Sequence, residues 1–140
     1  IRPCRCSCAN RNSRGWLTGK AGVSLGSWGE WAALRYFRRK GWELVARNWT
    51  TRSGEIDLIF YDRQELVFVE VKTRSNAVFG LPAAAVDARK QQKLMDSALY
   101  YLQNEMEKET DWRIDVIAIQ GKPFSEQAEL IWYENAITGS

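Results

Sequence analysis

The chain has 140 residues, 45% of them hydrophobic, and a formal net charge of +3. This length favours one domain, and the hydrophobic content favours a packed globule over a disordered chain. The absence of histidine excludes His-based catalysis and His metal ligands. No apolar run approaches the roughly 18 residues that a membrane helix needs, so we expect a cytoplasmic protein that does not contact a membrane.

The N-terminal residues 1–25 differ in composition from the rest of the chain. They hold five basic residues and no acid, and they lack hydrophobic periodicity. This predicts a flexible basic tail, followed by a single domain over residues 26–140. The tail either adds sequence-independent contacts to phosphates or has no specific role. Cys4, Cys6 and Cys8 lie in it. Three thiolates without a fourth ligand favour incidental cysteines over a metal clamp.

A helix is predicted over residues 27–40, with Ser27 as its N-cap and Gly41 as its stop. Its apolar stripe consists of Ala33, Leu34 and Phe37. Glu30 lies on the same stripe, one turn earlier. We expect it either to form a capping box with Ser27 or to point towards a site that holds other carboxylates.

Three strands are predicted next. The first covers residues 42–49 and is followed by a loop over 48–54; the other two cover 56–61 and 66–73 and form a hairpin. A four-residue loop between the hairpin strands would place Tyr61 opposite Leu66, and therefore Asp57 opposite Glu70. A loop of three or five residues would separate the two acids onto opposite faces.

Two directly opposed carboxylates are destabilising unless they share a proton or bind a cation. In the same register Lys72 lies two residues beyond Glu70, on the same face of the strand. Carboxylates for Mg²⁺, with a lysine for the phosphate or the attacking water, are the working parts of a metal-dependent phosphodiesterase. The competing interpretation is an ordinary cross-strand pair between Glu55 and Lys72.

The rest of the chain completes an α/β pattern. An irregular segment over 73–82 precedes a helix from Asp87, its N-cap, to about residue 107. Arg89, Lys90 and Lys93 crowd its first turns, where cations oppose the helix dipole, and this favours phosphate contact. Strands follow at 113–120, where Asp115 is either structural or supports the site, and at 129–133. The core order α-β-β-β-α-β implies a mixed sheet with helices on both faces.

Several segments together resemble the YraN family of small bacterial proteins. This family is a branch of the PD-(D/E)xK nuclease superfamily and is similar to archaeal Holliday-junction resolvases. The resemblance covers residues 25–134. It rests on Gly-Glu at 29–30, Gly-Glu-Ile-Asp-Leu-Ile at 54–59, Phe-Val-Glu-Val-Lys-Thr-Arg at 68–74, Phe-Gly at 79–80, Lys90, and Arg-Ile-Asp-Val-Ile-Ala at 113–118.

The resemblance implies a restriction-endonuclease-like three-layer α/β/α fold and hydrolysis of DNA phosphodiester bonds, with branched or junction DNA as the substrate. It implies Mg²⁺ or Mn²⁺ held by Asp57 and Glu70, and by Glu30 directly or through a water. Lys72 would orient the attacking water or stabilise the developing charge. The proline that often precedes the first of these carboxylates in the superfamily is Ile56 here.

The resemblance also implies that Arg74, Lys90 and Lys93 position the DNA backbone without reading its sequence. It implies a homodimer, a location in the bacterial cytoplasm near the nucleoid, and no organic cofactor. Two other functions compete with the endonuclease. One is a catalytically idle nucleic-acid-binding module, an accessory in DNA repair or uptake. The other is a protein-interaction domain whose charged residues form surface salt bridges.

Overall fold

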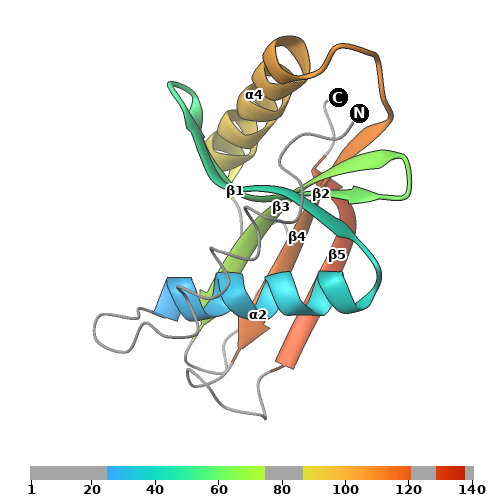
Figure 1. The fold of residues 1–140 in the computed structure, drawn as a ribbon. Coiled ribbons are helices and arrows are strands. Elements are labelled where there is room, and N and C mark those ends of the chain that lie inside the picture. Colours follow the sequence, from blue (N-terminus) through green and yellow to red (C-terminus); the bar gives the residue numbers. More distant parts are fainter. Residues whose placement is uncertain (1–24, 75–86, 121–128, 138–140) are drawn as a thin grey trace.

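Five strands form one mixed sheet in the order β1-β2-β3-β4-β5 (Figure 1). The structure, a computed structural model, describes residues 25–74, 87–120 and 129–137. Its elements are α2 (Leu25–Arg39), β1 (Glu43–Thr51), β2 (Gly54–Asp62), β3 (Glu65–Arg74), α4 (Ala88–Glu105), β4 (Trp112–Gln120) and β5 (Glu129–Ile137). Strands β3 and β4 run parallel, joined through α4, and the other neighbours are antiparallel. The predicted tail up to residue 24, with its three cysteines, and most of the predicted irregular segment lie outside the described residues.

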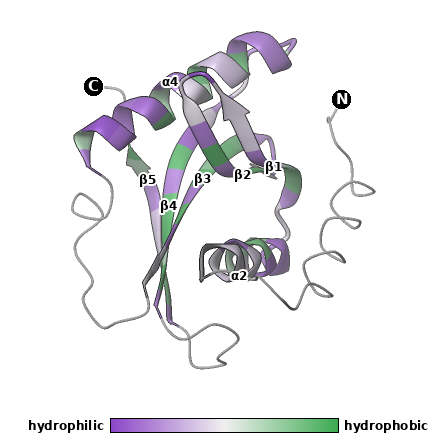
Figure 2. Cartoon of the chain, turned by 90° about the vertical axis from the view of Figure 1, so that its left-hand side faces the viewer, coloured by the Kyte–Doolittle hydropathy of each residue, from purple (hydrophilic) through white to green (hydrophobic). Residues whose placement is uncertain are grey.

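The two helices cover opposite faces of the sheet, as Figure 2 shows in the turned view. Side chains alternate along β3, so Val67 and Val69 pack with α2 while Leu66 and Phe68 pack with α4. Burying each such side chain contributes about 1.5–3 kcal/mol. The predicted mixed sheet between two helix layers is confirmed, and it is compatible with a restriction-endonuclease-like fold. In the described ranges, neither helix is both long and apolar enough to cross a membrane.

Helix α2 ends as predicted but begins earlier. Gly41, at a φ of 93°, follows the last turn, where its N–H donates to Arg38 and the Trp42 N–H donates to Phe37. This pattern of bonds is a glycine C-cap. The predicted N-cap was wrong, because the helix begins at Leu25 and Ser27 is already inside it. The capping box that depended on this start is therefore also wrong.

The register of the β2–β3 hairpin is the predicted one. Tyr61 faces Leu66, and the pairing continues to Leu58 opposite Val69. The turn is shorter than predicted, because Asp62 and Glu65 are themselves paired. The predicted loop over 48–54 was also wrong, because β1 continues to Thr51 and joins β2 through the two-residue turn 52–53. There the Thr51 hydroxyl accepts from the Ser53 N–H at 3.1 Å, which stabilises a tight turn.

The remaining boundaries differ from the prediction by a few residues. Asp87 is the N-cap of α4, and its carboxylate accepts from the Lys90 N–H at 2.8 Å, as predicted. The helix ends at Glu105, short of residue 107, because Met106 adopts an extended conformation. Strand β5 runs to Ile137, beyond the predicted end at residue 133.

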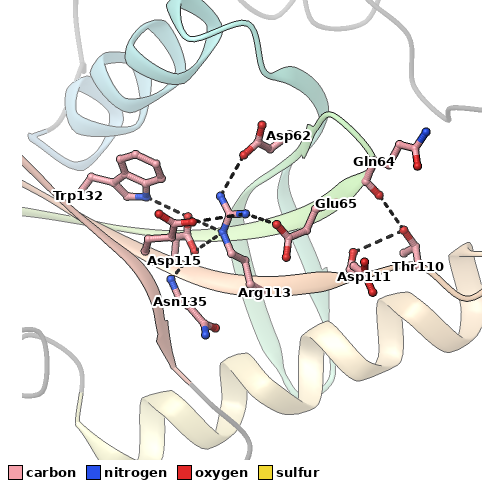
Figure 3. A network of polar contacts seen from close by, with 10 residues as sticks. Asp62, Gln64, Glu65, Thr110, Asp111, Arg113, Asp115, Trp132 and Asn135 are labelled. Atoms are coloured by element: carbon pink, nitrogen blue, oxygen red, sulfur yellow. Dashed lines mark hydrogen bonds and ion pairs between the residues drawn. The ribbon is translucent and has the colours of Figure 1, made fainter.

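The structure assigns Asp115 a structural role. Its fully buried carboxylate accepts from Arg113 Nε at 3.0 Å, Trp132 Nε1 at 2.9 Å and the Asn135 N–H at 2.8 Å (Figure 3). Arg113 also pairs with Glu65 and, at 3.4 Å, with Asp62. This network ties β5 and the hairpin turn to β4. It lies on the α2 side of β4, away from the acids at the end of β3.

Candidate active site

Strands β2 and β3 separate at the point where the predicted acids lie. The last paired residues are Leu58 and Val69, and beyond them the Asp57 carboxylate accepts from the Val71 N–H at 2.9 Å. The side chain of Asp57 thus occupies the place of the missing backbone partner. Its position beside Glu70 follows from the predicted register, although the ladder itself stops one residue earlier.

Glu70 is the buried acid of this site. The residue is 3% exposed, and its Oε2 lies 3.5 Å from Lys72 Nζ and 3.6 Å from Lys90 Nζ. Its Oε1 is buried and has no hydrogen-bond partner among the described residues. The pKa of Glu70 is raised to about 8, mainly by burial and also by the negative charge of Asp57, against the lowering effect of the two lysines.

Glu30 approaches the same site from α2. The pKa of Glu30 is raised to about 7, mainly by burial and also by the negative charge of Asp57. The Asn48 side chain acts in the opposite direction. The helix reaches this position because Gly29 lies directly on β3. A Cβ added to Gly29 would come within 1.8 Å of Thr73 Cγ2. The helix α2 and the strands β2 and β3 thus each contribute one acidic side chain to the site.

Of the basic residues predicted to act at the site, two contact Glu70 and two lie further away. Lys72 and Lys90 have side chains that are 28% and 37% exposed, and both contact Glu70. Lys90, predicted as a DNA-backbone contact, is therefore part of the carboxylate site. Lys93 is exposed one turn further along α4, and Arg74 is the last residue of β3, opposite Gln120 on β4.

In the part of the chain that the structure describes, the two ion pairs expected of a plain interaction domain are absent. Among the described residues, Glu55 makes no ion pair with Lys72, and no arginine pairs with Asp57. The hydroxyl of Thr50 contacts Glu55 at 3.5 Å instead. The charges at the end of β3 therefore converge on one buried point and do not form separate surface pairs.

The residues fit a magnesium-type ion through two protein ligands. No group of three acids or cysteines in the described part of the chain could hold a metal on its own. Mg²⁺, however, usually keeps several waters and uses one or two carboxylates together with substrate phosphate. Asp57 and Glu70 provide such a pair, and the unpartnered Oε1 of Glu70 provides a free acceptor. Whether Glu30 is a third ligand stays a prediction.

Two residues of β1 that were not predicted as site residues act on Glu30. The side chain of Asn48 and the positive charge of Arg47 both act to lower the pKa of Glu30. Asn48 has a φ of 51°, a left-handed conformation that asparagine tolerates better than most residues. The available signal is an asparagine at the overlap of the predicted strand 42–49 and the predicted loop 48–54.

Comparison with known proteins adds the family. The family model described as uncharacterised protein family UPF0102 matches residues 29–119. The chain belongs to the UPF0102 (YraN) family. A UPF0102 protein of Photobacterium profundum is 48% identical over 107 residues, which cover 75% of this chain and 82% of that protein. Another, from Caldanaerobacter subterraneus, is 41% identical over 100 residues, 71% of this chain and 82% of its own length.

A third UPF0102 protein, from Herpetosiphon aurantiacus, is 40% identical over 118 residues, which cover 79% of this chain and 95% of that protein. The predicted membership is thus confirmed. The region matched by the UPF0102 family model includes all four residues of the predicted catalytic set: Glu30, Asp57, Glu70 and Lys72. The names of these relatives state the family and no activity.

Proposed function

We propose that this UPF0102 protein is a metal-dependent DNA endonuclease that hydrolyses phosphodiester bonds in branched or junction DNA. The observation that carries the proposal is the environment of Glu70. Its buried carboxylate has one oxygen without a hydrogen-bond partner among the described residues. It lies near Asp57 and two lysines, just beyond the last paired residues of β2 and β3. Buried acids that repel one another are costly to maintain, and such groups are concentrated at functional sites.

Asp57 and Glu70 would hold Mg²⁺ or Mn²⁺. When bound, such an ion polarises the phosphate and lowers the pKa of a coordinated water. Lys72 donates to a phosphate oxygen and stabilises the negative charge that develops on it. Glu30, the acid that approaches the site from α2, would accept the proton of the attacking water. Water oxygen bonds to phosphorus, the bond from phosphorus to the leaving oxygen breaks, and that oxygen takes a proton from solvent.

The basic residues around the site would hold the DNA backbone. Lys90 lies at the site itself, and Lys93 continues the positive charge one turn along α4. Arg74 follows Lys72 by two residues at the end of β3. These contacts are to phosphate and carry no sequence information. A homodimer would offer two such sites to the two strands of a junction.

The test is cleavage of labelled duplex, single-stranded and four-way-junction DNA with Mg²⁺ or Mn²⁺. Loss of one charge-stabilising donor typically costs about 100- to 1000-fold in rate. We expect that loss for Lys72→Ala with little change in DNA binding. The matched control is Lys108→Ala, which removes an exposed lysine beyond the end of α4. Equal cleavage by wild type and Lys72→Ala would remove Lys72 from the mechanism.

The second candidate is a nucleic-acid-binding module without turnover. Its support is the cluster of Lys72 and Lys90 at the end of β3, which could bind phosphate without any hydrolysis. Under this alternative, wild type and Lys72→Ala would both bind junction DNA and neither would cleave it with either metal.

A further inference from the structure

A half-buried tryptophan and an exposed tyrosine form an aromatic pair between β1 and α4. The ring centroids of Trp49 and Tyr100 are 6.0 Å apart, and their planes are tilted by 43°. Tyr100 is 49% exposed, and with its neighbour Leu99 it is one of the two exposed large hydrophobic residues in the described ranges. Trp49 also packs edge-on against the buried Tyr101, with centroids 5.0 Å apart. The indole is therefore held from the core side, and the pair is a fixed apolar platform.

The platform lies beside the carboxylate site on the same two strands. Trp49 directly follows Asn48, whose side chain contacts Glu30. It is paired with Ile56, the residue before Asp57. Asn48 interacts with Glu30 of α2, while Trp49 packs against Tyr101 of α4, so the two neighbours face opposite sides of the sheet. On α4 the platform is ten residues beyond Lys90, which corresponds to about 15 Å of helix.

Positive charge lies on the same exposed face of α4 as Tyr100. Arg89 and Lys93 precede Tyr100 by 11 and seven residues, so all three share one exposed face of α4. Lys93 also lies against the β1–β2 turn, since a Cβ added to Gly54 would be 3.6 Å from Lys93 Cβ.

The same turn carries the exposed Arg52. Asp96 is the acid on this face, and its Oδ1 accepts from Gln92 at 2.9 Å. In proteins that bind single-stranded nucleic acid, basic side chains bind the phosphate backbone and aromatic rings stack against the bases. The residues on this face provide both kinds of group. A second copy of this chain would bring the same cations against each other.

We propose that Trp49 and Tyr100 stack an unpaired base of the strand that leads away from the carboxylate site. The 15 Å between Lys90 and Tyr100, at about 3.4 Å for each stacked nucleotide, corresponds to about four or five nucleotides. The substrate is then DNA that is single-stranded at this distance from the cleaved bond, because paired bases do not expose their faces. The inference rests on the proposed function and narrows its substrate class.

The test measures binding in EDTA, so that cleavage plays no part. A short single-stranded oligonucleotide carries 2-aminopurine, whose fluorescence falls when it stacks on an aromatic ring. We expect Tyr100→Ala to bind roughly 5- to 100-fold more weakly and to lose the fluorescence change. Tyr100→Phe keeps the ring, and Leu99→Ala removes a neighbouring exposed side chain, so both should resemble wild type. Binding of blunt duplex should change little in all three variants.

Each outcome separates the two proposals. If Tyr100→Ala binds the single strand as wild type does, the platform is overturned, while cleavage by Lys72 remains open to its own test. If stacking is lost in Tyr100→Ala but wild type cleaves no DNA, the endonuclease fails and the platform stands. If sedimentation shows that Tyr100→Ala turns a dimer into a monomer with unchanged DNA binding, the surface is a self-interface and the inference is wrong.

Discussion

The stability of the metal-free protein should fall as the pH rises, and Glu70 should cause much of the fall. An acid whose pKa is higher in the folded state favours folding while it is protonated. This stability is complete below the ordinary pKa of 4.5 and is lost as the pH passes about 8, the raised value. Each pKa unit corresponds to about 1.4 kcal/mol, so the full effect is about 5 kcal/mol. That is a large part of the stability of a small domain.

The measurement is urea unfolding in EDTA, followed by tryptophan fluorescence at several pH values across this range. Glu70→Gln keeps the shape of the side chain and cannot ionise, so its stability should decline much less. Glu109→Gln, at an exposed acid between α4 and β4, should follow wild type. If wild type and Glu70→Gln gave parallel curves, Glu70 would not be a buried acid with a raised pKa, and the description of the site would be wrong.

Two further substitutions test the packing that positions the site. Gly29→Ala should destabilise the protein by about 1–3 kcal/mol through overpacking against Thr73, although alanine in an ordinary helix is more stable than glycine by about 1 kcal/mol. Adding Thr73→Ser removes the clashing methyl group and should restore stability in urea unfolding; a Gly29→Ala protein more stable than wild type would contradict the contact. Asp115→Ala should cost about 3–5 kcal/mol by leaving Arg113 buried without its main partner. Glu134→Ala, 3.9 Å from Arg113 and 61% exposed, should cost less than about 1 kcal/mol, and equal losses would refute the network.

The order of the elements and the hairpin register could be predicted because they depend on local patterns. Alternation along β2 and β3 and a short polar turn determine which side chains share a face. This was enough to bring Asp57 and Glu70 together. The Gly41 stop of α2 and the Asp87 cap of α4 were predictable for the same reason, since each depends on one residue and its neighbours.

Other features depend on contacts between distant elements and had no local signal. Ser27 has the spacing of an N-cap, but the helix is extended upstream to Leu25. The structural role of Asp115 depends on Trp132 and Asn135, which lie on another strand and donate to its carboxylate. Lys90 looked like a surface cation at the start of a helix, and only the position of α4 over β3 brings it to Glu70.

Calorimetric titration with Mn²⁺ or Mg²⁺ at neutral pH tests whether Asp57 and Glu70 form a metal site. It compares wild type with Asp57→Ala and Glu70→Ala, after circular dichroism has shown that all three are folded. We expect one saturable binding event in wild type that is lost in both variants. Protons should be released on binding, because the raised pKa of Glu70 keeps it largely protonated at neutral pH before the metal binds. Absence of binding in the folded wild type, or the same binding in all three proteins, would contradict a metal site formed by these two carboxylates.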